Sequence, residues 1–357
     1  MRSRVWCAAA AAVLGFLTAG CGGGKGTQDN SGEKAAAGSG YPVAVTDCAG
    51  AKTTFSAAPE KIVTSNASSL ELLLRLGAGD RVVGTGFPPG KGTLPEGLDA
   101  EAQKVEVLGQ TVIPKEKLLG SGADLYIDTF ASMGGMGGMG GGMGDAPSPE
   151  EFKAAGIKHV YLKSTACAPM GKGPVTDLSA VEEDITSLGA VTGTRAKAME
   201  LVAGMKQQVD AVRKGIAGVG ENARPTYFLF DYDAGTKQPM AVCNRQVANA
   251  VITLAGARNV FADCEGDFKQ VSWEEVVAKN PDWIQLGVRN RGDDAANEKA
   301  FDEARKWLES NPATKGLKAV QEGHFLRIGS ERTTIAGVDN AAAVAEIART
   351  IHPDKVK

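Results

Sequence analysis

The sequence predicts an α/β protein built from two Rossmann-like lobes that one long interlobe α-helix joins. Three observations support this fold class. Short apolar runs alternate with helical runs over residues 61–162, and the same alternation returns over residues 225–351. Between these regions, apolar residues recur at helical spacing from Thr194 to about Ala217. At the usual rise per residue, this helix is about 35 Å long and reaches from one lobe to the other.

The N-terminal lobe is expected to span residues 41–176. It begins with a β-hairpin over residues 42–55, with its turn at residues 47–50. Strands are then expected over residues 61–64, 81–84, 105–108, 123–128 and 157–162. The helices expected between them cover residues 68–76, 114–119 and 148–155. This alternation favours a parallel sheet with helices on both faces.

The linking segment is expected to span residues 177–220, and the C-terminal lobe residues 221–357. The link starts with a helix over residues 177–188, which Gly189 is expected to end, and continues with the long helix. In the C-terminal lobe, strands are expected over residues 225–231, 282–288 and 324–328. The helices expected there cover residues 246–255, 272–278, 301–309 and 341–351.

The start of the chain has the organisation of an export signal. Two arginines precede an apolar run over residues 5–17, and small residues lead into Cys21. The run is too short to span a bilayer. The segment resembles the lipobox signal of bacterial lipoproteins, which implies that residues 1–20 are removed and that Cys21 carries the lipid (palmitate) anchor. We therefore expect a lipid-anchored protein on the extracytoplasmic face of the cell membrane, with residues 21–40 as a flexible tether.

Composition narrows the partners of the chain. The 357 residues carry a formal net charge of −3, and 23% of them are charged, so no basic surface points to nucleic acid. No later apolar run approaches the length of a membrane span, and the lipid is the expected membrane attachment. His159, His324 and His352 are scattered rather than clustered, so no direct metal site is expected.

Four cysteines remain once the signal segment and Cys21 are set aside. An even number in an oxidising compartment favours two disulfides over free thiols. Of the three possible connectivities, we favour Cys48–Cys167 and Cys243–Cys264, because each pair then lies within one lobe. A zinc site formed by all four thiolates is disfavoured, since no two of them have C-x2-C spacing.

Several segments carry a family resemblance in their order and spacing. They are residues 70–77 with 80–84, 115–119 with 123–127, 187–193, and 271–276 with 280–282. Over nearly all of residues 41–353, the chain resembles the class III substrate-binding proteins of ABC importers, which capture ferric siderophores, cobalamin and related large ligands.

The resemblance implies a stiff interlobe helix, a ligand cleft between the lobes that closes only slightly, and delivery of cargo to an ABC permease with no reaction catalysed. No cofactor is expected, and the protein is expected to be a monomer. The cargo expected first is a ferric siderophore, and the alternative is cobalamin or a deazaflavin-type cofactor precursor. An exported hydrolase is disfavoured, because the sequence lacks the G-x-S-x-G and H-E-x-x-H motifs.

In this family, one surface glutamate on each lobe contacts basic residues of the permease. By motif position, these glutamates fall on Glu116 and Glu274. Glu274 is preferred over Glu275, because Ser272 and Glu275 form a capping-box pattern. The alternative for Glu116 is simple stabilisation of a helix N-terminus just after Pro114.

The cleft is expected at the carboxyl ends of the strands, where loops from both lobes meet. Aromatic faces suit large flat ligands, and the donor fork of arginine suits carboxylate and hydroxamate–iron groups. Arg289 and Arg332 are therefore the preferred polar contacts. The candidate ligand contacts just past predicted strands are Ser65, Asn66, Phe87, Phe130, Tyr232, Asn244, Arg289 and Arg332.

Residues 132–144 (SMGGMGGMGGGMG) form an unusual glycine-rich segment with four methionines. Thioethers are soft ligands for Cu(I), and methionine is also an adaptable contact for large apolar ligands. Three interpretations stay open: a surface insertion without a ligand role, a lid over the cleft, and a copper site that would make the chain an extracytoplasmic copper-handling protein.

Overall fold

The computed structural model describes residues 40–129 and 146–357. The predicted signal segment, Cys21, Phe130 and the methionine-rich residues 132–144 lie outside the described residues. Within the part of the chain that is described, no helix combines the length and the apolar character needed to cross a bilayer. Each of the two four-stranded sheets lies inside one of the predicted lobes.

The first lobe contains a four-stranded parallel sheet in the order β4-β3-β5-β6. Its strands are β3 (Ile62–Thr64), β4 (Val82–Thr85), β5 (Leu125–Asp128) and β6 (Lys158–Tyr161). β3 and β5 are buried along their whole length, as strands covered on both faces are. An antiparallel hairpin precedes the sheet and pairs β1 (Val43–Thr46) with β2 (Lys52–Phe55). The predicted hairpin and the predicted parallel sheet are confirmed.

The strand expected over residues 105–108 is wrong. This segment makes only an isolated bridge between Val107 and Thr85. Leu108 instead packs against the backbone of β4 at Gly84, where a Cβ would lie 2.5 Å from Leu108 Cδ1. The segment therefore leaves the sheet instead of continuing as a strand.

Short helices accompany the first sheet. They are α1 (Ala67–Arg75), α2 (Glu96–Ala102), α3 (Lys115–Leu119), α4 (Pro149–Ala154) and α5 (Lys163–Ala166). Side-chain caps explain two of the starts, because Asn66 caps α1 and Ser148 caps α4, each within a capping box. The sequence analysis predicted neither α2 nor α5, since both are too short to show a helical repeat.

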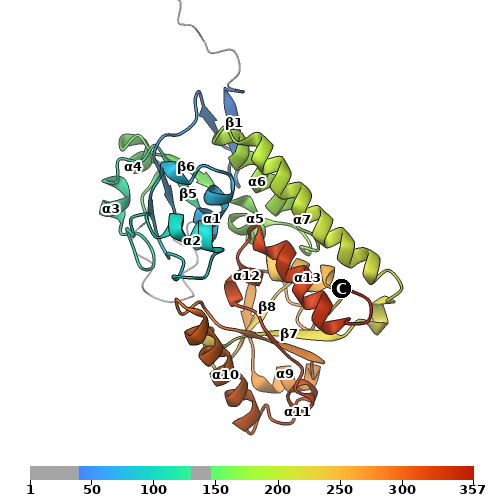
Figure 1. The fold of residues 1–357 in the computed structure, drawn as a ribbon. Coiled ribbons are helices and arrows are strands. Elements are labelled where there is room, and N and C mark those ends of the chain that lie inside the picture. Colours follow the sequence, from blue (N-terminus) through green and yellow to red (C-terminus); the bar gives the residue numbers. More distant parts are fainter. Residues whose placement is uncertain (1–39, 130–145) are drawn as a thin grey trace, which may run out of the picture. The chain divides into compact units, whose positions relative to one another are not determined.

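Two helices link the sheets, α6 (Ser179–Val191) and α7 (Arg195–Gly215). The predicted long helix is α7, which packs along α6 and along the C-terminal helix α13 (Asp339–Ile351), as Figure 1 shows. The prediction that Gly189 ends α6 is wrong, because α6 continues to Val191. Gly189 instead allows close packing, since a Cβ there would lie 2.3 Å from Ala198 Cβ on α7.

The second lobe contains a parallel sheet in the order β12-β11-β7-β9. Its strands are β7 (Thr226–Asp231), β9 (Arg258–Asn259), β11 (Trp283–Gly287) and β12 (Phe325–Arg327). A separate antiparallel pair joins β8 (Met240–Val242) to β10 (Phe268–Gln270). The other helices of this lobe are α8 (Val247–Leu254), α9 (Trp273–Lys279), α10 (Asp294–Ser310), α11 (Lys318–Glu322) and α12 (Ser330–Thr334). α10 starts earlier than predicted, because Asp293 caps it and accepts the N–H of Ala296.

One apolar core runs from the first sheet through α6 and α7 into α8 and α13. The residues that α7 buries in it are Ala198, Met205, Val209 and Val212. A second cluster, which includes Phe228 and Trp273, fills the space around α9 and β11. Because the first core is continuous, α7 is held on both sides, and this favours a stiff link between the two sheets.

The structure contains both expected disulfides. Cys48–Cys167 joins the turn of the β1–β2 hairpin to the end of α5. Cys243–Cys264 joins the end of β8 to the segment between β9 and β10.

Candidate functional site

The carboxyl edge of the first sheet is a buried hydrogen-bond cluster. Ser65 and Asn66 follow β3, and Thr129 follows β5. Ser65 Oγ lies 3.0 Å from Thr129 Oγ1, and Asn66 Nδ2 donates to the same hydroxyl oxygen at 2.6 Å. Asn66 Oδ1 also accepts the backbone N–H of Ser69 as the cap of α1. The structure thus brings these two predicted contacts together, but their polar atoms already bond to the protein itself. Sequence reasoning missed Thr129.

Phe87, which follows β4, has an unusual backbone. Its φ is +34°, a region that residues with a Cβ rarely adopt. Two backbone hydrogen bonds hold it there: Phe87 N donates to Thr111 O at 3.1 Å, and Phe87 O accepts from Ala67 N at 3.0 Å. These hydrogen bonds keep the backbone in this unfavourable conformation. The half-buried phenyl group is therefore held in place at the carboxyl edge. Strain of this kind is found most often where a side chain has a functional task.

The carboxyl edge of the second sheet carries a group of opposite charges. Asp231 ends β7, Asp233 lies in the turn that follows, and Glu331 lies in α12 after β12. Arg289 follows β11, and its backbone N–H donates to Asp233 Oδ2 at 2.6 Å. The side chain of Arg291 also pairs with Asp233. Of this charged group, Arg289 was the one residue predicted from the sequence, although the three carboxylates also lie at or just after strand ends.

The pKa values of two of these carboxyls are perturbed. Burial is the largest cause and raises the pKa of both Asp231 and Glu331 above the ordinary range. The positive charge of Arg289 and backbone hydrogen bonds oppose this rise, while Asp231 adds repulsion at Glu331. Arg289 and the backbone hydrogen bonds therefore do not fully offset the effect of burial on the pKa of either carboxyl.

Arg332 and Tyr232, two further predicted contacts, are engaged within the second lobe. Arg332 donates to Glu346 Oε2 on α13 at 2.7 Å, which commits its guanidinium to an ion pair. Tyr232 is half-buried, and its ring meets Phe230 edge-on at a centroid distance of 5.9 Å. The guanidinium of Arg332 is therefore not free to bind an anionic group of a ligand.

Asn244 follows β8 and contacts the segment that leads into α6. Its backbone O accepts the N–H of Val175 at 2.7 Å. Its side-chain Oδ1 is buried and has no hydrogen-bond partner among the described residues. Because an unsatisfied buried acceptor is costly, this oxygen would gain from a donor on a ligand.

Loops from the two carboxyl edges are in direct contact. A Cβ at Gly90, in the loop after β4, would lie 2.5 Å from Gly292 Cα in the loop after β11. At the start of α1, Ser68 Oγ donates to Ala336 O, just before α13, at 3.0 Å. These contacts place the end of the first sheet beside the end of the second.

A buried carboxyl group lies at the second of these contacts. Glu71 of α1 is 6% exposed, and Arg75 Nε donates to its Oε1 at 2.7 Å. Asp339, the first residue of α13, lies 3.6 Å from Arg75 Nη2 and is hydrogen-bonded to Glu71. Burial and then the charge of Asp339 raise the pKa of Glu71 to about 7, against the opposing effect of Arg75.

This raised pKa predicts how stability depends on pH. Since the folded-state pKa of Glu71 lies above its unfolded value, the native state binds the extra proton, and stability falls as pH rises from about 4.5 to about 7. Glu71→Gln removes the charge and should stabilise the protein at pH 8 by about 1–3 kcal/mol, with little effect at pH 5. Thermal unfolding of both proteins at the two pH values checks this. Glu116→Gln, at an exposed position, serves as the control. A difference between wild type and Glu71→Gln that does not change with pH contradicts the assignment.

The two predicted docking glutamates are exposed in the first turns of short helices. Glu116 lies in α3 and Glu274 in α9. Within the described residues, neither carboxylate has an ion pair or a hydrogen bond. Glu275 instead completes the capping box with Ser272, as expected, and its Oε2 accepts the Ser272 N–H at 2.8 Å. Glu116 and Glu274 are therefore available to a partner, one on each lobe.

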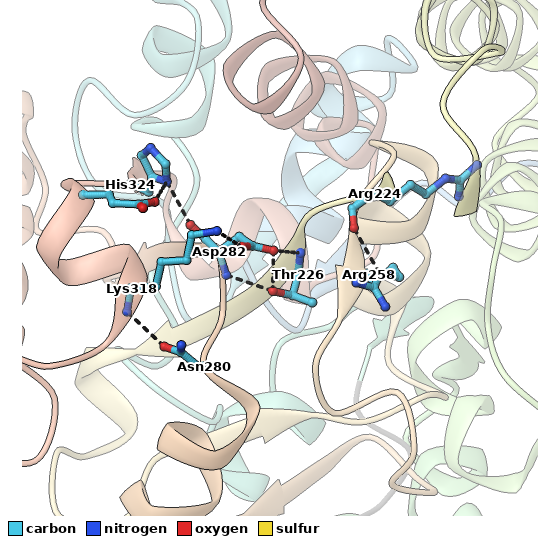
Figure 2. A network of polar contacts seen from close by, with 8 residues as sticks. Arg224, Thr226, Arg258, Asn280, Asp282, Lys318 and His324 are labelled. Atoms are coloured by element: carbon cyan, nitrogen blue, oxygen red, sulfur yellow. Dashed lines mark hydrogen bonds and ion pairs between the residues drawn. The ribbon is translucent and has the colours of Figure 1, made fainter. Parts of the chain in front are cut away.

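A second polar network, shown in Figure 2, lies at the opposite, amino end of the second sheet. Asp282 Oδ2 accepts from Thr226 N at 2.8 Å and from Thr226 Oγ1 at 2.7 Å, and Lys318 Nζ lies 2.6 Å from Asp282 Oδ1. Burial acts to raise the pKa of Asp282, but these hydrogen bonds outweigh it and lower that pKa. The network fastens β7, β11 and α11 together and has a structural role.

Two hollows lie outside the set of predicted contacts. One of about 130 Å³ lies between β1, β6 and α6, and one of about 410 Å³ lies beside Trp283 and His352. Of the predicted ligand contacts that the structure describes, none lines either hollow. The ligand position at the carboxyl edges therefore stays a prediction.

Two parallel-sheet lobes bridged by one long helix define a two-lobe binding-protein fold. Residues 62–331 match the family model described as periplasmic binding protein. The chain belongs to the periplasmic binding protein family, in its class III form, whose members bind solutes for transport.

Relatives and a solved structure agree with this assignment. The ABC transporter substrate-binding lipoprotein YvrC of Bacillus subtilis, itself described as uncharacterized, is 24% identical over 100% of this chain and 99% of its own length. A cobalamin-binding protein of Halobacterium salinarum is 25% identical over 70% of this chain and 59% of its own length. The crystal structure of a periplasmic binding protein from Veillonella parvula has a TM-score of 0.71 at 25% identity, with 88% of this chain and 98% of that chain covered.

Proposed function

We propose that this chain is an extracytoplasmic lipoprotein receptor that captures a large organic or metal-chelate cargo and delivers it to an ABC importer permease. The observation that carries the proposal is the meeting of the two carboxyl edges, in a chain of the periplasmic binding protein family. In α/β proteins, ligands bind where loops converge beyond the carboxyl ends of strands. The name of the Bacillus relative supports the permease partner and the lipid anchor at Cys21.

Within this class of cargo, a ferric siderophore is our first choice, as the sequence resemblance implies. Cobalamin or a deazaflavin-type precursor is the second, and the name of the Halobacterium relative supports cobalamin. Both leading candidates are metals wrapped in an organic chelate, which suits a site made of aromatic and polar side chains without a cluster of metal ligands in the described residues. The continuous core around α7 favours a largely preformed site with a small cost of closure.

Among the aromatic candidates in the described residues, we favour Phe87 as a cargo contact, and its strained backbone allows a specific test. Phe87→Ala and Phe87→Gly both remove the ring and should each weaken cargo binding about tenfold. Glycine tolerates positive φ, so Phe87→Gly should be more stable than Phe87→Ala by about 1 kcal/mol. Titration and urea unfolding of both variants check these expectations. Equal stability of the two variants, or unchanged affinity, counts against this assignment.

Cellular uptake tests the proposed function. Cells that lack the gene should lose uptake of a ⁵⁵Fe-loaded trihydroxamate or of a labelled corrinoid, and the full chain should restore it. The Cys21→Ser variant should restore little uptake, because the receptor would no longer be held at the membrane. Undiminished uptake of every chelate in the deletion strain would refute the proposal.

A further inference from the structure

We propose that Asp231 and Glu331 select cargo by its charge, so that the site accepts neutral or positively charged chelates and rejects those with net negative charge. This inference rests on the proposed function and narrows the class of cargo. It concerns the carboxyl edge of the second sheet, where both side chains lie.

Three arginines of the second lobe are already neutralised. One follows each of β8, β11 and β12, and each has a carboxylate neighbour. The ion pairs are Arg245 with Glu265 at 3.3 Å, Arg291 with Asp233, and Arg332 with Glu346 at 2.7 Å. An anionic cargo would have to compete with these internal carboxylates for each of the three guanidinium groups.

Asp231 and Glu331 are in excess over the remaining cation. Arg289 is the charge that offsets both of them, and Glu331 Oε1 gains one further donor, the N–H of Asn290 at 3.2 Å. Burial is the largest cause of the upward pKa shift of both carboxyls, and the opposing charge of Arg289 does not outweigh it. A cationic cargo would reduce this excess of negative charge, and a neutral cargo would leave it unchanged. An anionic cargo would increase it.

The first lobe does not reverse this balance. Among the described residues of its carboxyl edge, Ser65, Asn66 and Thr129 are neutral, and Asp128, the last residue of β5, lies 3.1 Å from His159 Nε2. Lys163, which follows β6, donates to Thr46 Oγ1 at 2.8 Å and pairs with Glu183 at 3.8 Å. Lys91, in the loop after β4, is exposed to solvent, where its charge is screened.

Ferric chelates differ in net charge, so this balance of charges distinguishes between classes of cargo. Three hydroxamates, each a monoanion, neutralise Fe³⁺, and an added ammonium group makes the complex a cation. Three catecholates, each a dianion, leave the ferric complex a trianion. The charges at the second lobe therefore favour ferric hydroxamates over ferric catecholates, and they admit corrinoids without net negative charge.

Titration of the full chain by intrinsic fluorescence tests the inference. The three probes are a neutral ferric trihydroxamate, a ferric trihydroxamate with one free ammonium group, and a ferric tricatecholate. Wild type should bind the first two at least about tenfold more tightly than the third. The double variant Asp231→Asn with Glu331→Gln should shrink this preference by about tenfold.

Matched controls separate charge from damage to the fold. Glu200→Gln, on the exposed face of α7, makes the same kind of charge change and should leave the preference unaltered. With wild type alone, added salt should weaken binding of the ammonium probe more than that of the neutral probe. Equal or tighter binding of the tricatecholate by wild type overturns the charge selection alone. If the chain binds none of the three probes and also fails to bind a corrinoid, the proposed function and the inference are overturned together.

Discussion

The double variant Glu116→Arg with Glu274→Arg should abolish uptake while the Kd for cargo stays within about twofold of wild type. Each glutamate is exposed, has no partner among the described residues, and lies on a different lobe. If these carboxylates form ion pairs with basic residues of the permease, reversing both charges replaces two attractive contacts with two repulsive ones. The proposed cargo site lies at the strand ends, away from both substitutions, and should be left intact. Uptake in cells and titration of the purified variant measure the two quantities separately.

The matched control for this variant is Glu150→Arg with Asp294→Arg. These residues are also exposed acids in the first turn of a helix, one in α4 and one in α10. The control has the same change in net charge and one substitution on each lobe, and it should keep uptake near the wild-type level. If the control loses uptake equally, net charge rather than docking explains the effect. A large loss of cargo affinity in the test variant refutes the assignment to a permease-facing surface.

Loss of the long-range disulfide should have the largest effect on stability. Cys48→Ser with Cys167→Ser opens a bond that spans 119 residues of sequence, and Cys243→Ser with Cys264→Ser opens one that spans 21. On the loop-entropy model, the free energies of unfolding should fall by about 5 and about 3 kcal/mol. Urea unfolding of the two oxidised double variants gives this comparison. A larger loss for the shorter loop contradicts the entropic explanation and points to local packing around Cys243.

Local sequence signals predicted most of the fold. Strong alternation of strands and helices located both parallel sheets, and the Ser272–Glu275 pattern located the start of α9. The pair of β8 and β10 escaped prediction, because Phe268–Gln270 is exposed along its length and shows no apolar alternation. Gly189 did not mark a helix end as predicted, because the glycine is required by the close contact of α6 with α7.

The sequence predicted where the candidate site residues lie along the chain, but not which residues they contact. Strand ends indicated Phe87 and Arg289, because the carboxyl ends of parallel strands meet at one edge. The partner of Arg332, Glu346, and the contact of Glu71 with Asp339 depend on how α13 packs, which no local pattern encodes. For this reason the sequence indicated Arg332 as a polar ligand contact but did not reveal that Glu346 already pairs with it.

The most direct test of the account is a fluorescence titration of the mature chain with ferric trihydroxamates and corrinoids. We expect saturable quenching by at least one of them at a stoichiometry of one cargo per chain, weakened by Phe87→Gly and unaffected by the docking variant. The absence of saturable binding to any of these chelates would contradict the claim that the paired carboxyl edges form a cargo site.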